Sequence, residues 1–180
     1  MAMLRAFYKF LKKRHSVVAR FRLMTEVGKK VLPQYRFNWP YLDWWNDAPF
    51  NAYLKRFNEL GHFNTDRRYM LYQLMRLVEG VPGDTVECGS LEGAGSYLIH
   101  MMNDRAGRHQ RWHHIFDSFE GLSAPGEGDG EHWEQGDLSV SMEQVGKNMG
   151  NFNRYTLYRG WIPSRFPEVQ DKCFAFVHID

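Results

Sequence analysis

The sequence predicts an α/β fold, a doubly wound parallel sheet that follows a helical N-terminal extension. From Thr85 onward, short β-rich runs alternate with turns and helical stretches, which is the order of elements in such a sheet. A glycine-rich turn joins the first of these runs to a helix, where sheets of this kind bind ligands. The chain has 180 residues, 43% of them hydrophobic, which suffices for one globular domain with an appendage.

The opening segment is strongly basic. The first thirty residues hold nine lysines and arginines against one acid, Glu26, although the whole chain carries a net charge of only +2. From Leu4 to Leu23, apolar side chains recur among these cations with helical periodicity, which predicts a basic amphipathic helix. Such a helix either packs on its own domain or a partner, or lies on an anionic membrane surface. We expect no nucleic-acid partner, since no recognition module surrounds these charges.

An aromatic, proline-rich stretch follows between Leu32 and Phe50. It predicts an irregular connecting segment or lid, because proline interrupts helices while tryptophan offers large surfaces. We therefore divide the chain into residues 1–63, comprising the basic helix, this connector and one further helix, and residues 64–180, the N-terminal half of the sheet domain. The residues that define the connector are Pro33, Trp39, Pro40, Trp44, Trp45 and Pro49.

The sheet domain is predicted to contain four strands. They run from Thr85 to Cys88, His113 to Phe116, Tyr155 to Tyr158 and Phe174 to Ile179. Helices are predicted over Phe50 to Leu60, Thr65 to Glu79, Ser96 to Asn103 and Ser141 to Met149. The second of these has Asn64 or Thr65 as its N-cap and Gly80 just beyond its end.

The two cysteines bear on the compartment. Cys88 and Cys173 both occur in apolar, strand-like runs, so we expect buried, reduced thiols and a cytoplasmic location. No apolar stretch reaches the roughly 18 residues of a membrane span, and charges occupy the place of a signal peptide's apolar segment. The chain is therefore predicted to remain unexported.

The turn after the first strand is the first candidate binding element. Gly89, Gly93 and Gly95 lack side chains where a backbone must approach a ligand, and the following helix directs its N-terminal amides there. The spacing differs from the dinucleotide and phosphate-loop patterns, which disfavours a pyrophosphate. Glu87 at the strand end favours a cationic ligand, such as the amino group of a methionine moiety. Alternatively, Glu87 caps neighbouring backbone and the glycines serve tight packing.

The second strand ends in an acid as well. A carboxylate at this edge of an open α/β sheet can bind both hydroxyls of a ribose, so Asp117 is the ribose candidate. The alternative is that Asp117 caps the turn through Ser118 and Gly121.

Four segments together resemble a known family. They are Val81 to Glu87, Phe116 to Leu122, Gly136 to Val140 and Tyr158 to Trp161, of which Asp-Ser-Phe-Glu-Gly-Leu is the most specific. In order and spacing they resemble the macrocin O-methyltransferase family of TylF type, over roughly Thr65 to Asp180. The basic N-terminal segment lies outside the resemblance.

The resemblance implies a Rossmann-like class I methyltransferase with S-adenosylmethionine as methyl donor, a divalent metal, usually Mg²⁺, and a hydroxyl of a sugar or glycosylated small molecule as acceptor. By position, the methionine part would contact Glu87, Gly89, Ser90, Gly93, Gly95 and Ser96. The ribose would contact Asp117 and Ser118, and the adenine would contact Ser139, Val140, Gly160 and Trp161.

The last strand carries the remaining candidates. Asp180 matches the aspartate that begins the family's metal site, and the family's further acids would come after it. His178, on the same strand face, is a candidate general base. We expect an incomplete fold, with an open sheet edge that favours marginal stability or self-association. Two other functions stay open: a non-catalytic nucleoside-binding module, and a membrane-surface methyltransferase for lipid-linked sugars.

Overall fold

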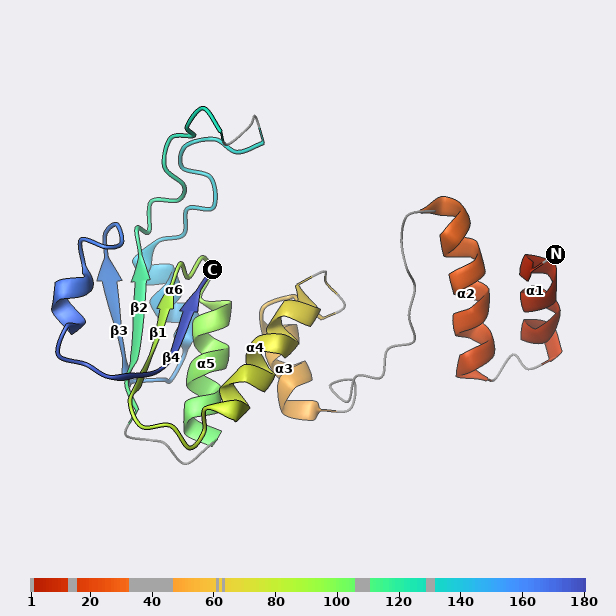
Figure 1. Cartoon of the computed structure of the whole chain (residues 1–180), viewed down its shortest axis with the longest axis horizontal. Helices are drawn as coiled ribbons and strands as arrows, with labels where there is room; N and C mark the ends of the chain where they lie inside the picture. Colours follow the sequence, from red (N-terminus) through yellow and green to blue (C-terminus); the bar gives the residue numbers. More distant parts are fainter. Residues whose placement is uncertain are drawn as a thin grey trace. The chain divides into compact units, whose positions relative to one another are not determined.

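The computed structural model describes residues 2–12, 16–32, 47–60, 62, 64–105, 111–128 and 132–180. The chain forms two compact units, Met1–Trp45 and Asn46–Asp180, which are treated separately below (Figure 1). The boundary therefore falls earlier than the predicted division between residues 63 and 64. The predicted aromatic connector lies outside the described residues, except for its two ends, Leu32 and residues 47–50.

The first unit contains two helices, α1 (Ala2–Lys12) and α2 (Val17–Val31), which pack against each other. The prediction of one continuous helix from Leu4 to Leu23 is thus wrong. Ser16 has extended backbone angles, φ −79° and ψ 120°, and is the N-cap of α2. The sequence offers a reason, because five consecutive polar residues from position 12 to 16 interrupt the apolar pattern.

Helix α3 (Ala48–Arg56) begins the second unit and explains the earlier boundary. The Asp47 side chain accepts a hydrogen bond from the Phe50 amide at 2.9 Å and so caps the helix. The Phe50 ring stacks on Tyr72 of α4 (Thr65–Leu77) with 5.1 Å between centroids. The Tyr53 hydroxyl donates to the Ala94 carbonyl at 3.1 Å. These contacts join α3 to the sheet unit.

The sheet has four parallel strands in the order β3-β2-β1-β4. Each predicted strand is confirmed to within one residue at either end (Figure 1). The strands are β1 (Asp84–Cys88), β2 (His113–Asp117), β3 (Tyr155–Arg159) and β4 (Phe174–Ile179). The later predicted helices are confirmed as α5 (Ala94–Arg105) and α6 (Met142–Met149). Asn64 holds the N-cap position of α4 without a side-chain capping bond.

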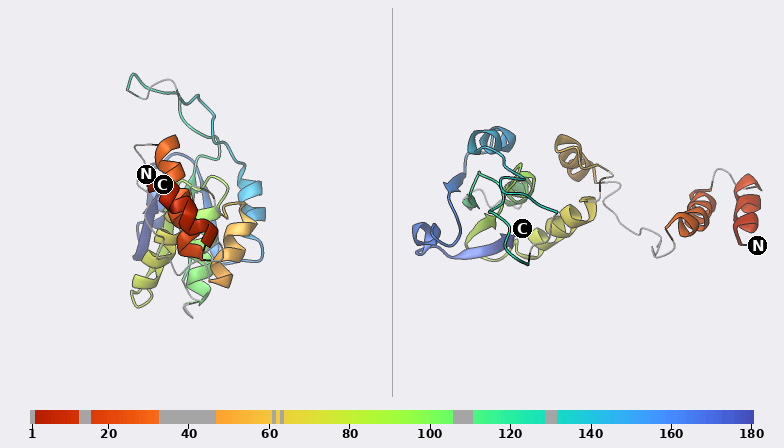
Figure 2. Two further views of the ribbon diagram at one scale, coloured as in Figure 1. Left: turned by 90° about the vertical axis from the view of Figure 1, so that its right-hand side faces the viewer. Right: turned by 90° about the horizontal axis from the view of Figure 1, so that it is seen from above.

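The two faces of the sheet are covered differently. Helices α5 and α6 lie on one face (Figure 2), where Asn103 of α5 donates to Thr85 Oγ1 at 2.9 Å. On the other face, the short helix η2 (Phe166–Val169) contributes Val169 to a buried cluster with Val86, Cys88, Phe116 and Tyr158. Of β4, Phe174 packs against this cluster, whereas Val177 and Ile179 are 53% and 78% exposed.

The cysteines depart in part from expectation. Both thiols are free, and Cys88 is buried as predicted, which raises its pKa. Cys173 is exposed, because it precedes β4 instead of lying within it. Among the described residues, no helix combines the length and apolar character that crossing a bilayer requires.

Candidate functional site

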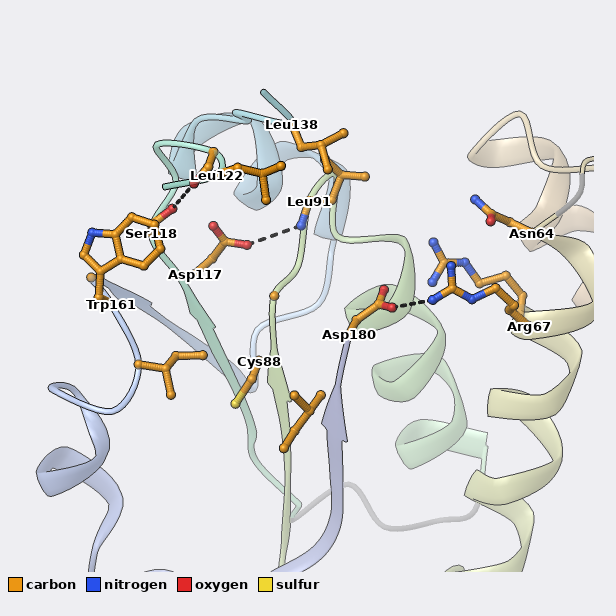
Figure 3. A pocket seen from close by; sticks show the side chains of 16 residues that line it. Asn64, Arg67, Cys88, Leu91, Asp117, Ser118, Leu122, Leu138, Trp161 and Asp180 are labelled. Atoms are coloured by element: carbon orange, nitrogen blue, oxygen red, sulfur yellow. Dashed lines mark hydrogen bonds and ion pairs between the residues drawn. The ribbon is translucent and has the colours of Figure 1, made fainter. Parts of the chain in front are cut away.

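A cavity of about 500 Å³ opens at the carboxyl ends of the strands. Figure 3 shows Trp161 and Leu122 on one side of it and Asn64 and Arg67 on the other. One end is therefore apolar and aromatic, and the other is polar. The lining residues of the apolar end include Leu122, Leu138, Trp161 and Ile162, and those of the polar end Asn64, Arg67, Arg68 and Asp180.

Asp117 lies between the two ends and holds the neighbouring loops. Its Oδ2 accepts hydrogen bonds from the Ser90 amide at 2.6 Å, the Ser90 hydroxyl at 3.1 Å and the Leu91 amide at 3.3 Å. Its Oδ1 accepts one bond, from the Phe119 amide at 2.7 Å. A carboxylate offers about four lone-pair positions. Oδ1 can consequently accept a further hydrogen bond from a ligand hydroxyl.

Three bulky residues around this acid have left-handed backbone angles. The φ values are 46° at Leu91, 56° at Phe119 and 62° at Leu138. Large side chains rarely adopt such angles, and each instance costs roughly 1–3 kcal/mol. Strained residues of this kind gather at functional sites. Leu91 and Leu138 line the cavity, which supports its assignment as the site.

The three glycines of the turn have different neighbours. Gly89 borders the cavity and has φ +87°, and a Cβ added to it would lie 3.0 Å from the Asp180 carbonyl oxygen. A Cβ on Gly93 would lie 3.1 Å from Val145, and one on Gly95 would overlap Glu87 Oε1. Gly93 and Gly95 thus allow close protein packing, which was the alternative to ligand approach.

Glu87 lies beneath the turn and does not line the cavity. Its side chain is 1% exposed, accepts a hydrogen bond from the Ser96 hydroxyl, and lies 2.8 Å from His178 Nδ1. This hydrogen bond raises the pKa of His178 against the opposing effect of partial burial. The carboxylate therefore connects the start of α5 to β4.

Asp180 has a basic partner. Its Oδ1 lies 2.7 Å from Arg67 Nη2 (Figure 3), and its amide donates to the Cys88 carbonyl at 3.0 Å. Within the described ranges, no three His, Cys, Asp or Glu side chains are grouped so that they could hold a metal ion. Mg²⁺ needs several oxygen ligands, so the described residues do not by themselves form a complete magnesium site, and Asp180 as its first ligand stays a prediction.

The structure gathers some of the predicted site residues and separates others. Those that line the cavity are Gly89, Asp117, Ser118, Gly160, Trp161 and Asp180. Ser139 and Val140 line a second, polar hollow with Glu92, Ser141, Gln144 and Asn148. Ser90 donates a hydrogen bond to Asp117. The predicted residues that line neither space are Glu87, Gly93, Gly95, Ser96 and His178.

Sequence reasoning missed the wall that α4 contributes. Arg68 is bidentate to Glu59, with Nε to Oε2 at 2.9 Å and Nη2 to Oε1 at 3.0 Å, which fixes the first turn of α4 beside the cavity. The adjacent Arg67 and Asn64 are exposed to the same space. From the sequence, two consecutive arginines at the start of a helix do not indicate a cavity wall. Their place beside the cavity depends on how α4 packs.

This fold, with its cavity at the carboxyl edge, belongs to the Rossmann-like methyltransferases. The chain superimposes on the structure of the O-methyltransferase NovP with a TM-score of 0.54 and 26% identity, covering 64% of this chain and 53% of that one. The calicheamicin methyltransferase CalS11 shares the fold, with a TM-score of 0.56 at 18% identity over 87% of this chain and 65% of that one.

Residues 66–180 match the model of the macrocin O-methyltransferase (TylF) family, and the chain belongs to that family. A relative from Streptomyces olivaceus is 8-demethyl-8-(2,3-dimethoxy-alpha-L-rhamnosyl)-tetracenomycin-C 4'-O-methyltransferase. The two are 32% identical over 118 residues, which is 58% of this chain. The chain spans 44% of that protein's length.

Proposed function

We propose that this chain binds S-adenosylmethionine in the carboxyl-edge cavity and serves an O-methyltransferase that acts on a hydroxyl of a sugar or glycosylated small molecule. The observation that carries the proposal is Asp117, which keeps a free acceptor position on Oδ1 inside the cavity. The family membership and the rhamnosyl substrate in the name of the relative support the reaction and its acceptor class.

The cofactor would lie with its ribose on Asp117 and its adenine against the apolar end. Trp161, Leu122 and Leu138 supply a surface on which a heterocycle can pack without competing water. S-adenosylmethionine supplies a methyl group on a cationic sulfonium when it is bound. The Asp117 carboxylate favours that charge, because it lines the cavity and opposes its sign, whereas the Asp180 carboxylate is paired with Arg67.

The methyl acceptor would enter from the polar end. Asn64 and Arg67 can donate hydrogen bonds to sugar oxygens, and Asp180 can accept from hydroxyls. His178 remains the proposed base; it precedes Ile179 and Asp180, which line the cavity, although it does not line that space itself. Its Nδ1 faces Glu87 at 2.8 Å, so Nε2 is the ring atom that can take a proton. The proposal includes no step through a metal, and the free cysteines are compatible with the proposed cytoplasmic location.

Binding can be tested first by calorimetry with S-adenosylhomocysteine on the full chain. We expect one binding site and a loss of about tenfold in affinity for Trp161→Ala, from the lost aromatic contact. Trp112→Ala is the matched control, because Trp112 is a partly exposed tryptophan at the opposite end of the sheet. Equal losses in both variants, or no heat from the unmodified chain, would refute the assigned cavity.

The reaction is tested separately with tritiated S-adenosylmethionine and sugar-bearing acceptors, with Mg²⁺ and with a chelator. Transfer of label to the acceptor supports the enzyme, and the chelator arm decides whether a metal takes part. Binding of S-adenosylhomocysteine without transfer to any acceptor would instead support the alternative, a non-catalytic nucleoside-binding module.

A further inference from the structure

We propose that the first unit docks on an anionic phospholipid surface through the uncovered apolar face of α1. This inference does not depend on methyl transfer, because it concerns only α1 and α2. It assigns a partner to a segment that lies outside the family match, which begins at residue 66.

The apolar face is defined by Leu4, Phe7, Tyr8 and Leu11. Their exposed fractions are 75%, 49%, 58% and 58%. With about 3.6 residues per helical turn, these four positions form one continuous strip along α1. Ala6, on the opposite side of the helix, is buried at 8% exposure. The side of α1 that packs on α2 is therefore distinct from the apolar face.

The described residues of the unit form only a small buried core. Among its described side chains, the buried ones are Ala6 and Ala19, two methyl groups that allow the helices to approach closely. Helix α2 itself exposes Met24 at 71% and Val31 at 72%. A helix pair with so small a core and so much apolar exposure is typical of segments that complete their burial on a partner.

The charges beside the apolar face select the kind of partner. Arg5, Lys9 and Lys12 occupy the adjoining strip of α1, and Lys12 Nζ lies 4.8 Å from the centroid of the Tyr8 ring. Long cationic side chains in this place can reach phosphate groups while their aliphatic stems and the apolar face enter the hydrocarbon boundary. An anionic bilayer presents a layer of phosphate groups for the cations and, below it, hydrocarbon for the apolar face. A protein partner would need an apolar groove with an acidic rim.

The test is flotation of the full chain with vesicles of phosphatidylcholine alone and of phosphatidylcholine with phosphatidylserine. We expect binding to the anionic vesicles, weakened by salt because surface charges are screened. Phe7→Ser with Leu11→Ser should reduce the partition coefficient more than about tenfold. Leu77→Ser is the matched control, since Leu77 is an exposed leucine of α4, at 78%, in the other unit; it should bind like the unmodified chain.

The double serine variant could weaken binding by unfolding α1. A second pair of variants, which keep the helix, tests the proposal independently. Lys9→Gln and Lys12→Gln preserve helix propensity, and each should lower binding to anionic vesicles by roughly fivefold while leaving neutral vesicles unaffected. Equal binding to both vesicle types, or an equal loss in Leu77→Ser, would overturn the proposal. So would a vesicle-independent dimer in sedimentation that Leu11→Ser dissociates, because the face would then belong to a second copy.

Discussion

Both ends of the parallel sheet carry polar side chains, but the cavity borders the carboxyl end. At the carboxyl end, Asp117 and Asp180 face a space of about 500 Å³. At the amino end, Asp84 and His114 bond to each other, and Arg111 donates to nearby backbone carbonyls. Polar composition alone therefore does not distinguish a site from a structural network.

The amino-end network is closed by specific bonds. Arg111 is 6% exposed, and its guanidinium donates to the carbonyl of Val81 at 2.5 Å and to that of Val78 at 3.4 Å. His114 lies 2.8 Å from the Tyr158 hydroxyl through Nδ1 and 3.1 Å from Asp84 through Nε2. The two ends differ because Asp117 Oδ1, at the carboxyl end, can accept a further hydrogen bond and lines an open space.

The largest expected effect is on stability and comes from the amino end. Arg111→Met should lower the free energy of unfolding by about 3 kcal/mol, because the buried guanidinium and its hydrogen bonds to the partly buried carbonyls of Val78 and Val81 are lost. Affinity for S-adenosylhomocysteine at temperatures below the transition should not change. Denaturant titration and calorimetry measure the two quantities. The exposed Arg76→Met is the control and should change stability by less than about 0.5 kcal/mol.

The next effect is on binding and comes from the carboxyl end. Asp117→Asn should weaken S-adenosylhomocysteine by about thirtyfold, since an amide nitrogen would face donors that now bond to a carboxylate oxygen. Asp84→Asn is the matched change at the other end of the sheet, and we expect it to leave affinity unaltered. If calorimetry found the two variants equally impaired, the functional contrast between the ends would be wrong.

An effect of similar size, on stability and not on binding, tests whether Gly95 serves protein packing. Gly95→Ala should cost about 2 kcal/mol, because the new methyl group would lie against the buried Glu87 carboxylate. Gly146→Ala in α6 has nothing closer than the Tyr155 hydroxyl at 3.8 Å, and should stabilise by about 0.5 kcal/mol through reduced backbone entropy. Thermal unfolding of both variants tests whether Gly95→Ala lowers the free energy of unfolding and Gly146→Ala raises it.

The smallest effect is a pH dependence at the amino end. Burial lowers the pKa of His113 from 6.5 to about 3, so the unfolded state binds a proton that the folded state rejects in this window. Stability should therefore fall as pH decreases from about 6.5, by about 1 kcal/mol over the first pH unit. His113→Asn should reduce this slope, and the exposed His132→Asn should retain it. A slope unchanged by His113→Asn would assign the proton uptake to other groups.

The sequence predicted the sheet well because each strand and turn is encoded locally. Alternation of short β-rich runs with turns and helical stretches located β1 to β4, and the acid at the end of β2 was found from its position alone. Long-range partners could not be found this way. Glu87 bonds to His178 across 91 positions, and Asp180 meets Arg67 across 113. Both pairings depend on strand order and helix packing, which no local pattern specifies.

The break between α1 and α2 was missed for a related reason. Hydrophobic periodicity extended through position 23 and suggested one helix, whereas the extended backbone at Ser16 starts a second. The left-handed angles at Leu91, Phe119 and Leu138 were equally unpredictable, because leucine and phenylalanine normally avoid them. Backbone strain that tertiary contacts impose cannot be predicted from the type of residue.

The bonds from Asp117 Oδ2 to Ser90 and Leu91 have a consequence for how a ligand enters. They give the turn after β1 its shape through contacts within the protein itself. Binding then requires little ordering of the main chain, so less of the interaction free energy is lost to entropy. Association should accordingly proceed in a single kinetic phase, close to that of a rigid receptor.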